Sequence, residues 1–190
     1  MFDHIEKVIH EAIIKTEDEL NIASLTIKHG LHSFRYGSSE FLNEIFINLP
    51  LSQSSIFYDL GSGYGRVLLF GAIQYPNATF KGLEIIEERN LVCKSVAEQL
   101  GLKNLFVFNA DILNFDLSDG NIFYIYNPLY GFQYQSLLDT LEKVAANKQI
   151  IIVAEAKCDI FDKVNWLENY HSMNYDVTHK IKFYKSIQPN

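Results

Sequence analysis

The chain has 190 residues, of which 48% are hydrophobic and 14% aromatic, so it carries enough apolar side chains for one buried core. Its 16 Lys and Arg against 23 Asp and Glu give a formal net charge of -7. A negative protein lacks the cationic surface on which broad nucleic-acid binding depends, because that binding comes from contacts with phosphates. We therefore expect a single domain over residues 1–190 and no nucleic-acid partner.

No apolar run approaches the roughly 20 residues that a membrane-spanning helix requires, so we expect no membrane association. The first 20 residues carry six acids and two lysines and lack the continuous apolar core of a signal peptide, which predicts a cytoplasmic protein. Cys93 and Cys158 fit no zinc-ligand spacing, and His29 and His32 have no carboxylate or cysteine partner nearby in the sequence. We expect free thiols and no metal site.

The N-terminal part is expected to be helical. Apolar residues recur at three-and-four spacing over residues 2–20, as in an amphipathic helix with an acidic outer face. Ser38-Ser39 is a typical helix N-cap and predicts a second helix through Asn48, which Pro50 ends. We interpret residues 1–50 as a helical lid or cap.

Residues 51–190 alternate short apolar runs with helical patterns. The runs are nearly continuous in apolar residues, as in strands buried on both faces of a parallel sheet, and cover Ile56–Leu60, Thr79–Ile85, Leu105–Asn109, Ile122–Tyr126 and Gln149–Ala154. The amphipathic segments between them predict covering helices over Val67–Tyr75, Glu87–Leu100 and Ser136–Ala146. This alternation predicts an α/β fold built from right-handed βαβ units.

The pattern changes after Ala154. A helix is expected around Ile160–Tyr170, followed by strands over Tyr175–Thr178 and Lys180–Ile187. Two strands so close in sequence must pair as antiparallel neighbours. The chain is thus expected to end in an antiparallel hairpin.

The run Asp59-Leu60-Gly61-Ser62-Gly63-Tyr64-Gly65-Arg66 joins the first predicted strand to a predicted helix. Closely spaced glycines at such a turn let the backbone approach a nucleotide, and an acid at the strand end can bind a cationic or hydroxylic group. A dinucleotide fingerprint would need glycine at position 66, where this chain has Arg66. The run therefore disfavours a nicotinamide-dependent oxidoreductase.

The pattern Asp-x-Gly-x-Gly-x-Gly resembles motif I of the class I S-adenosylmethionine-dependent methyltransferases. The resemblance implies a Rossmann-like three-layer sandwich with a mostly parallel seven-stranded sheet, an antiparallel C-terminal hairpin and preceding N-terminal helices. It also implies S-adenosyl-L-methionine as the cofactor, held by the loop residues Asp59, Gly61, Ser62, Gly63 and Gly65.

Two further acids follow the next two predicted strands. Glu84 lies 25 residues after Asp59, where a carboxylate can accept hydrogen bonds from both ribose hydroxyls. Asp111 resembles the acid that contacts the adenine amino group in these methyltransferases. With the adjacent Ile85 and Ile112 they are expected to bind the cofactor. Alternatively, Asp59 caps the next helix, Glu84 is a solvated strand-end acid and Asp111 caps a short turn.

The fourth predicted strand ends in Tyr126-Asn127-Pro128-Leu129-Tyr130. This resembles motif IV of the amino-group methyltransferases, although Leu129 replaces the second proline. There the amide oxygen holds the target nitrogen and the aromatic ring stacks on its planar group, which implies catalytic roles for Asn127 and Tyr130 and a cofactor contact for Asn127. The alternative is an Asn-Pro turn with aromatic packing.

Upstream, Tyr36-Gly37-Ser38-Ser39-Glu40 is similar to a lid segment of the histone lysine methyltransferases that lack a SET domain. Together these resemblances imply methyl transfer to an undefined nucleophile, a nitrogen on a protein side chain or a small molecule. The alternative is a non-catalytic S-adenosylmethionine-binding module or partner subunit. The sequence leaves the oligomeric state open.

Overall fold

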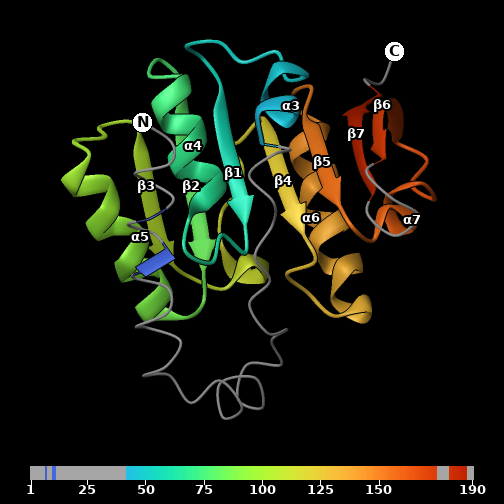
Figure 1. Cartoon of the computed structure of the whole chain (residues 1–190). Helices are drawn as coiled ribbons and strands as arrows, with labels where there is room; N and C mark the ends of the chain where they lie inside the picture. The colour runs from blue at the N-terminus through green and yellow to red at the C-terminus, as the bar shows by residue number, and fades with distance from the viewer. Residues whose placement is uncertain (1–6, 8–9, 12–41, 175–179, 188–190) are drawn as a thin grey trace.

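A computed structural model describes residues 7, 10–11, 42–174 and 180–187 of the chain. Its centre is a seven-stranded sheet in the order β3-β2-β1-β4-β5-β7-β6 (Figure 1). Strands β1 to β5 are parallel, and β7 pairs antiparallel with both β5 and β6. The strands are β1 (Ile56–Leu60), β2 (Thr79–Glu84), β3 (Leu105–Asn109), β4 (Ile122–Tyr126), β5 (Ile151–Glu155), β6 (Leu167–Asn174) and β7 (Lys180–Ser186). The predicted mixed sheet is confirmed.

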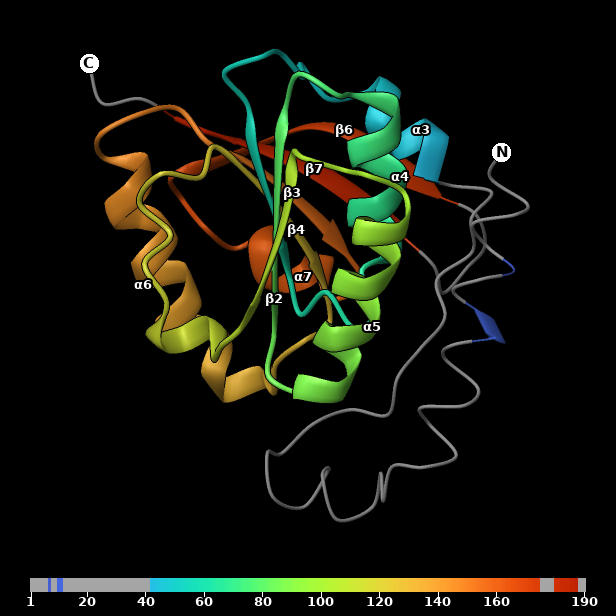
Figure 2. The same cartoon turned by 90° about the vertical axis from the view of Figure 1, so that its left-hand side faces the viewer.

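Helices cover both faces of the sheet (Figure 2). One core cluster joins the sheet to α3 (Leu42–Ile47), α4 (Arg66–Gln74) and α5 (Glu87–Gln99). The other joins the opposite face to α6 (Tyr134–Ala145) and α7 (Cys158–Phe161), with the short 3-10 helices η2 (Ile112–Asn114) and η3 (Gly131–Gln133) in the connections nearby. The described residues therefore form the three layers that the resemblance implied.

The layers are held by apolar stripes at the spacing that the sequence showed. Helix α6 buries its residues at three-and-four spacing, Leu137, Leu138, Leu141 and Val144. Helix α4 can lie close to the sheet because it carries Gly71, where a Cβ would stand 2.4 Å from Phe80 and 2.7 Å from Phe46. The helices on this face and the sheet therefore pack against each other through aromatic side chains.

The predicted helix around Ile160–Tyr170 is wrong. Helix α7 ends at Phe161, and β6 begins at Leu167. Ile160, Val164 and Leu167 have helical spacing, but pairing with β7 along the whole of β6 satisfies that backbone and overrides the local pattern. The hairpin is antiparallel as expected, with its first strand earlier than residues 175–178, which lie outside the described residues.

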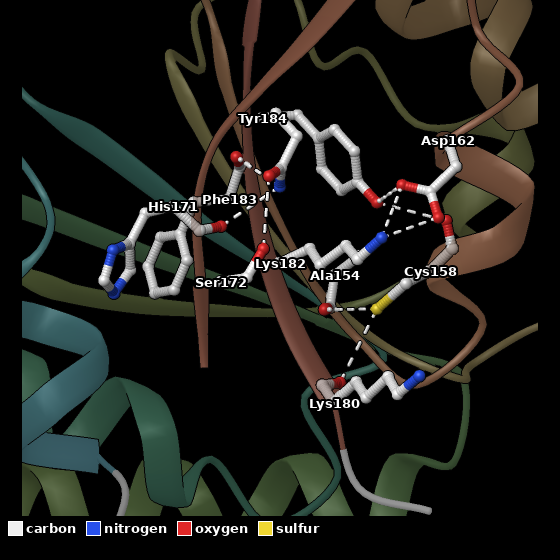
Figure 3. Close-up of polar contacts among 10 residues, drawn as sticks. Ala154, Cys158, Asp162, His171, Ser172, Lys180, Lys182, Phe183 and Tyr184 are labelled. Atoms are coloured by element: carbon white, nitrogen blue, oxygen red, sulfur yellow. Dashed lines mark hydrogen bonds and ion pairs between the residues drawn. The ribbon is translucent and has the colours of Figure 1, made fainter. Parts of the chain in front are cut away.

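Polar contacts fasten α7 to the hairpin (Figure 3). The Lys182 ammonium lies 2.8 Å and 2.7 Å from the two carboxylate oxygens of Asp162. The Tyr184 hydroxyl lies 2.9 Å from Asp162 Oδ1 and 3.1 Å from the Cys158 carbonyl oxygen. The Cys158 thiol is buried and faces the carbonyl oxygen of Ala154 at 3.3 Å. In this group the Lys182 ammonium balances the Asp162 carboxylate, and the Tyr184 hydroxyl and the Cys158 thiol both have hydrogen-bond acceptors.

Most of the predicted N-terminal lid falls outside the described residues. This applies to the helix over residues 2–20, except for positions 7, 10 and 11, and to the segment Tyr36–Glu40. The second predicted helix is described as α3, and its proposed cap Ser38-Ser39 lies outside. The lid stays a prediction.

Candidate functional site

The glycine loop leaves β1 and doubles back across the end of β2. The backbone N–H groups of Gly61 and Ser62 both donate to the Leu83 carbonyl oxygen at 2.9 Å. Gly61, Gly63 and Gly65 have φ values of 88°, 53° and 74°, in the left-handed region that favours glycine. The loop therefore needs glycine for its backbone path.

At two of these glycines there is also no room for a side chain. A Cβ on Gly61 would stand 2.4 Å from Pro128 Cβ, and one on Gly65 would stand 2.0 Å from Cys93 Sγ. The first contact brings the loop against the Asn127-Pro128 turn, so the two motifs lie side by side. The second seats the loop on α5. Ser62 packs behind the loop, where its Oγ would be 2.8 Å from a Cβ on Gly82.

Glu84 is 7% exposed, so the alternative of a solvated strand-end acid is wrong. Its two carboxylate oxygens accept hydrogen bonds from Gly63 N at 2.9 Å and Ile86 N at 2.8 Å. Burial raises the pKa of Glu84, and these amides together with the Arg89 guanidinium partly oppose the rise. A carboxylate has about four lone-pair sites, more than these amides use, so a ligand hydroxyl can also bond to it.

Asp59 is the most buried acid of the site, at 3% exposure. It does not cap the next helix, because the N-cap residue of α4 is Gly65 and no side chain caps that helix. Burial, and then the charges of Glu84 and Glu155, raise the pKa of Asp59 well above its usual value. Among the residues that the structure describes, none forms an ion pair with Asp59.

Asp111 caps a short turn, as the alternative interpretation expected. It is the N-cap of η2 and accepts hydrogen bonds from Leu113 N at 2.9 Å and Asn114 Nδ2 at 2.8 Å. Its neighbour Ile112 is buried in the core that includes α6. Ile85, at the end of β2, is half-buried, and its carbonyl oxygen accepts from Asn109 Nδ2 at 3.0 Å.

Asn127 follows β4 with a left-handed φ of 48°. Its amide Oδ1 is buried and has no hydrogen-bond partner in the described part of the chain. The following turn is closed by hydrogen bonds of 2.9 Å in both directions between Tyr130 and Gln133. This turn presents the Tyr130 ring parallel to that of Phe132, with centroids 6.4 Å apart.

Sequence reasoning missed Glu155, the last residue of β5. It is 4% exposed and accepts a hydrogen bond from the Tyr124 hydroxyl. The signal was available, because Glu155 directly follows an apolar run at a strand end, as Asp59 and Glu84 do. Its hydrogen bond with Tyr124 joins neighbouring strands, which the linear sequence does not show.

The arrangement suits an adenosine-type ligand with a positive charge. The glycine loop is a cradle that side chains would fill, Glu84 retains acceptor capacity, and Asp59 is a buried acid that no described residue pairs with a cation. Within the described ranges no group of three or more His, Cys, Asp or Glu could hold a metal ion. No described helix is long and apolar enough to cross a membrane. His29 and His32 lie outside these ranges.

Comparisons with known proteins agree with this geometry. The profile of the family described as histone methylation protein DOT1 matches residues 29–124, slightly more than half of the chain. A search of curated protein sequences finds no match.

Solved structures share the fold at low sequence identity. An RNA methyltransferase from Salinibacter ruber in complex with S-adenosyl-L-homocysteine has a TM-score of 0.64 and 16% identity, over 80% of this chain and 94% of that one. A putative methyltransferase from Escherichia coli has a TM-score of 0.64 and 14% identity, over 81% and 90%. A methyltransferase from Aquifex aeolicus has a TM-score of 0.60 and 13% identity, over 77% and 89%.

Proposed function

Since the chain belongs to the DOT1 histone methylation family and is an S-adenosylmethionine-dependent methyltransferase of class I, we propose that its acceptor is a nitrogen on a protein side chain or small molecule. The observation that carries this proposal is the buried Asn127 Oδ1. A buried acceptor without a donor is unfavourable, and an amino group supplies the missing N–H. The contact between Gly61 and Pro128 supports the proposal, because it brings the turn that contains Asn127 against the glycine loop.

S-adenosylmethionine supplies a methyl group that is already activated on a sulfonium. We propose that the glycine loop from Gly61 to Gly65 lies against it, with Asp59 facing its positive part and Glu84 its ribose hydroxyls. Ile85, Asp111 and Ile112 would line the adenine side, with Asp111 using the lone pairs that its own turn leaves.

The remaining work for the protein is to align the acceptor and exclude water. Asn127 would fix the nitrogen through Oδ1, and the Tyr130 ring would lie along the flat side of its carrier. An ammonium must lose its proton before it can attack, and no described residue is assigned as the base. Oriented carbonyl oxygens and an aromatic ring are sufficient to align the acceptor nitrogen.

The test has a binding arm and a transfer arm. Calorimetry with S-adenosylmethionine, S-adenosylhomocysteine and NAD should show binding of the two sulfur cofactors and not of NAD. Labelled methyl transfer should then be measured to basic proteins, small amines and RNA, because the Salinibacter ruber neighbour is an RNA methyltransferase. Label in the protein or amine fraction supports the proposal, and label in RNA alone contradicts it.

Asn127→Ala should reduce transfer by about 100-fold while cofactor binding stays within a factor of about three. Asn147→Ala is a matched control, since Asn147 is exposed just after α6 and its side-chain Nδ2 donates to the Lys143 carbonyl oxygen. Cofactor binding without transfer to any acceptor would favour the non-catalytic module instead.

A further inference from the structure

The buried stripe of helix α5 changes from apolar to polar toward the start of the helix. Farther along, the stripe consists of Cys93, Val96 and Ala97. Its first residues are instead Arg89 and Asn90, which are 5% and 7% exposed. A polar side chain is unfavourable in a buried position unless it is hydrogen-bonded, so each of these two needs a partner.

The two polar residues differ in the partners that the protein offers. The Arg89 guanidinium lies 5.7 Å from the centre of the Tyr64 ring, and its charge lowers the pKa of Glu84 against the effect of burial. The Asn90 Nδ2 is buried and has no hydrogen-bond partner in the described part of the chain. The described residues thus leave this donor for an acceptor that they do not supply.

The neighbours of Asn90 on α5 lie against the glycine loop. Arg89, directly before it, lies over the ring of Tyr64 in that loop. Cys93, one turn later, has its Sγ 2.0 Å from the position of a Cβ on Gly65. Residues three positions apart are neighbours on the surface of a helix. The Asn90 side chain therefore lies on the part of α5 that faces the glycine loop.

The cofactor brings one negative group to this loop, the carboxylate of its methionine part. The proposed site has acids for the other parts of the cofactor, with Asp59 for the positive part and Glu84 for the ribose. An ionised acid cannot donate a hydrogen bond to a carboxylate, whereas a side-chain amide can. Hydrogen bonds to a charged group are also stronger than those between neutral groups. The buried Asn90 donor and the carboxylate therefore complement each other.

We propose that Asn90 binds the cofactor carboxylate through Nδ2 and makes the site selective for ligands that carry this group. This inference rests on the proposed function, in which the cofactor lies against the glycine loop. The bond satisfies a donor that is already buried in the free protein, so little new desolvation is needed at Asn90. Asn90 is then a cofactor-binding residue on a helix behind the loop.

Calorimetry on the full chain compares two ligands that carry no methyl group for transfer. S-adenosylhomocysteine has the complete amino acid part, and its decarboxylated analogue keeps the adenosine, the sulfur and the amine. The wild type should bind the first about tenfold or more tightly, as one hydrogen bond to a charged group provides. Asn90→Leu removes the donor at similar size. This ratio of affinities should fall about tenfold in the variant, with affinity for the analogue within a factor of about two.

Two further variants complete the test. Asn90→Asp keeps the shape of the side chain but puts a carboxylate beside that of the ligand, so the ratio should fall by more than in Asn90→Leu. It also serves if leucine disturbs the packing of α5. Gln99→Leu makes the same change from an amide to leucine at an exposed position of α5 and should leave the ratio as it is.

Each outcome decides the proposal. A loss confined to S-adenosylhomocysteine in both Asn90 variants, with Gln99→Leu unchanged, supports it. An equal loss for the two ligands would mean that Asn90 only packs α5 against the loop. That result, no loss for either ligand, or a wild type that binds both equally overturns the proposal and leaves the methyltransferase assignment intact. A wild type that binds neither ligand overturns the proposed function, and this inference with it.

Discussion

Two of the tyrosine–carboxylate pairs among the described residues differ in their surroundings. In the hairpin, Tyr184 donates to Asp162, and the Lys182 ammonium completes the group (Figure 3). At the site, Tyr124 donates to Glu155, and the nearest acid, Asp59, has no ion pair in the described ranges. The first group includes its own cation, whereas no described residue forms an ion pair with Asp59 in the second.

The pKa values of the two aspartates express the same difference. Burial would raise the pKa of Asp162, but hydrogen bonds from Lys182 and Tyr184 outweigh it and lower the pKa. For Asp59, burial and two neighbouring carboxylates all act upward. A fold without function would gain stability by replacing Asp59, so its presence points to ligand binding.

The largest expected effect comes from closing the cradle that adjoins Asp59. In Gly65→Ala the new methyl would overlap Cys93 Sγ at 2.0 Å on a backbone with φ of 74°. The free energy of unfolding should fall by about 3 kcal/mol, and cofactor binding should be lost. Chemical denaturation measures the free energy of unfolding, and calorimetry measures cofactor binding.

Gly101→Ala separates packing from backbone strain. Gly101 has a φ of 66° but nothing within 4 Å of an added Cβ. Its substitution should cost only about 1 kcal/mol and leave cofactor binding unchanged. Equal losses in the two variants would mean that the Cys93 contact has no special weight.

The next effect compares the two aspartates directly. Asp59→Asn should make the protein more stable at pH 7, by on the order of 1 kcal/mol, and weaken S-adenosylmethionine binding about tenfold or more. An acid with a raised folded-state pKa loses stability as pH rises above its unfolded value near 4. The gain in Asp59→Asn should therefore disappear as the pH falls toward 4. Melting curves across pH measure it.

Asp162→Asn should show the reverse pattern. The lowered pKa of Asp162 contributes stability above about pH 4 that is lost in acid, so the variant should be less stable at pH 7. The loss should stay below about 1 kcal/mol because Asp162 is partly exposed. Cofactor affinity should not change. Destabilisation by both substitutions would contradict the distinction between the two acids.

The sequence was sufficient for the parts of the fold that are locally encoded. Continuous apolar runs marked β1 to β5, and amphipathic spacing marked α4, α5 and α6. The expected burial on both faces is wrong for β3, which lies at the sheet edge and exposes Phe106. The same rule failed at β6, where Leu167–Asn174 owes its form to pairing with β7, a contact that periodicity does not carry.

The site divides in a similar way. The turn of the glycine loop and the strand-end position of Glu84 were predictable from the sequence, and burial of Glu84 excludes the solvated alternative. Glu155 has the same strand-end position, but its hydrogen bond with Tyr124 comes from the neighbouring strand, which the linear sequence does not show. The unpaired Asn127 Oδ1 likewise depends on what surrounds it in space.

The smallest expected effect concerns the exposed edge of the site. Phe132 is 83% exposed, and its ring lies parallel to Tyr130, at an angle of 2°. Phe132→Ser should leave the free energy of unfolding within about 0.5 kcal/mol, because little apolar contact is lost. If the pair guides the acceptor, KM for the acceptor should rise about 2- to 10-fold, with cofactor affinity unchanged. Phe106→Ser, at an exposed position of the edge strand β3, should leave KM as it is. An equal rise in KM for both variants would show that exposed apolar area alone attracts the acceptor, and that the site edge is no different from the rest of the surface.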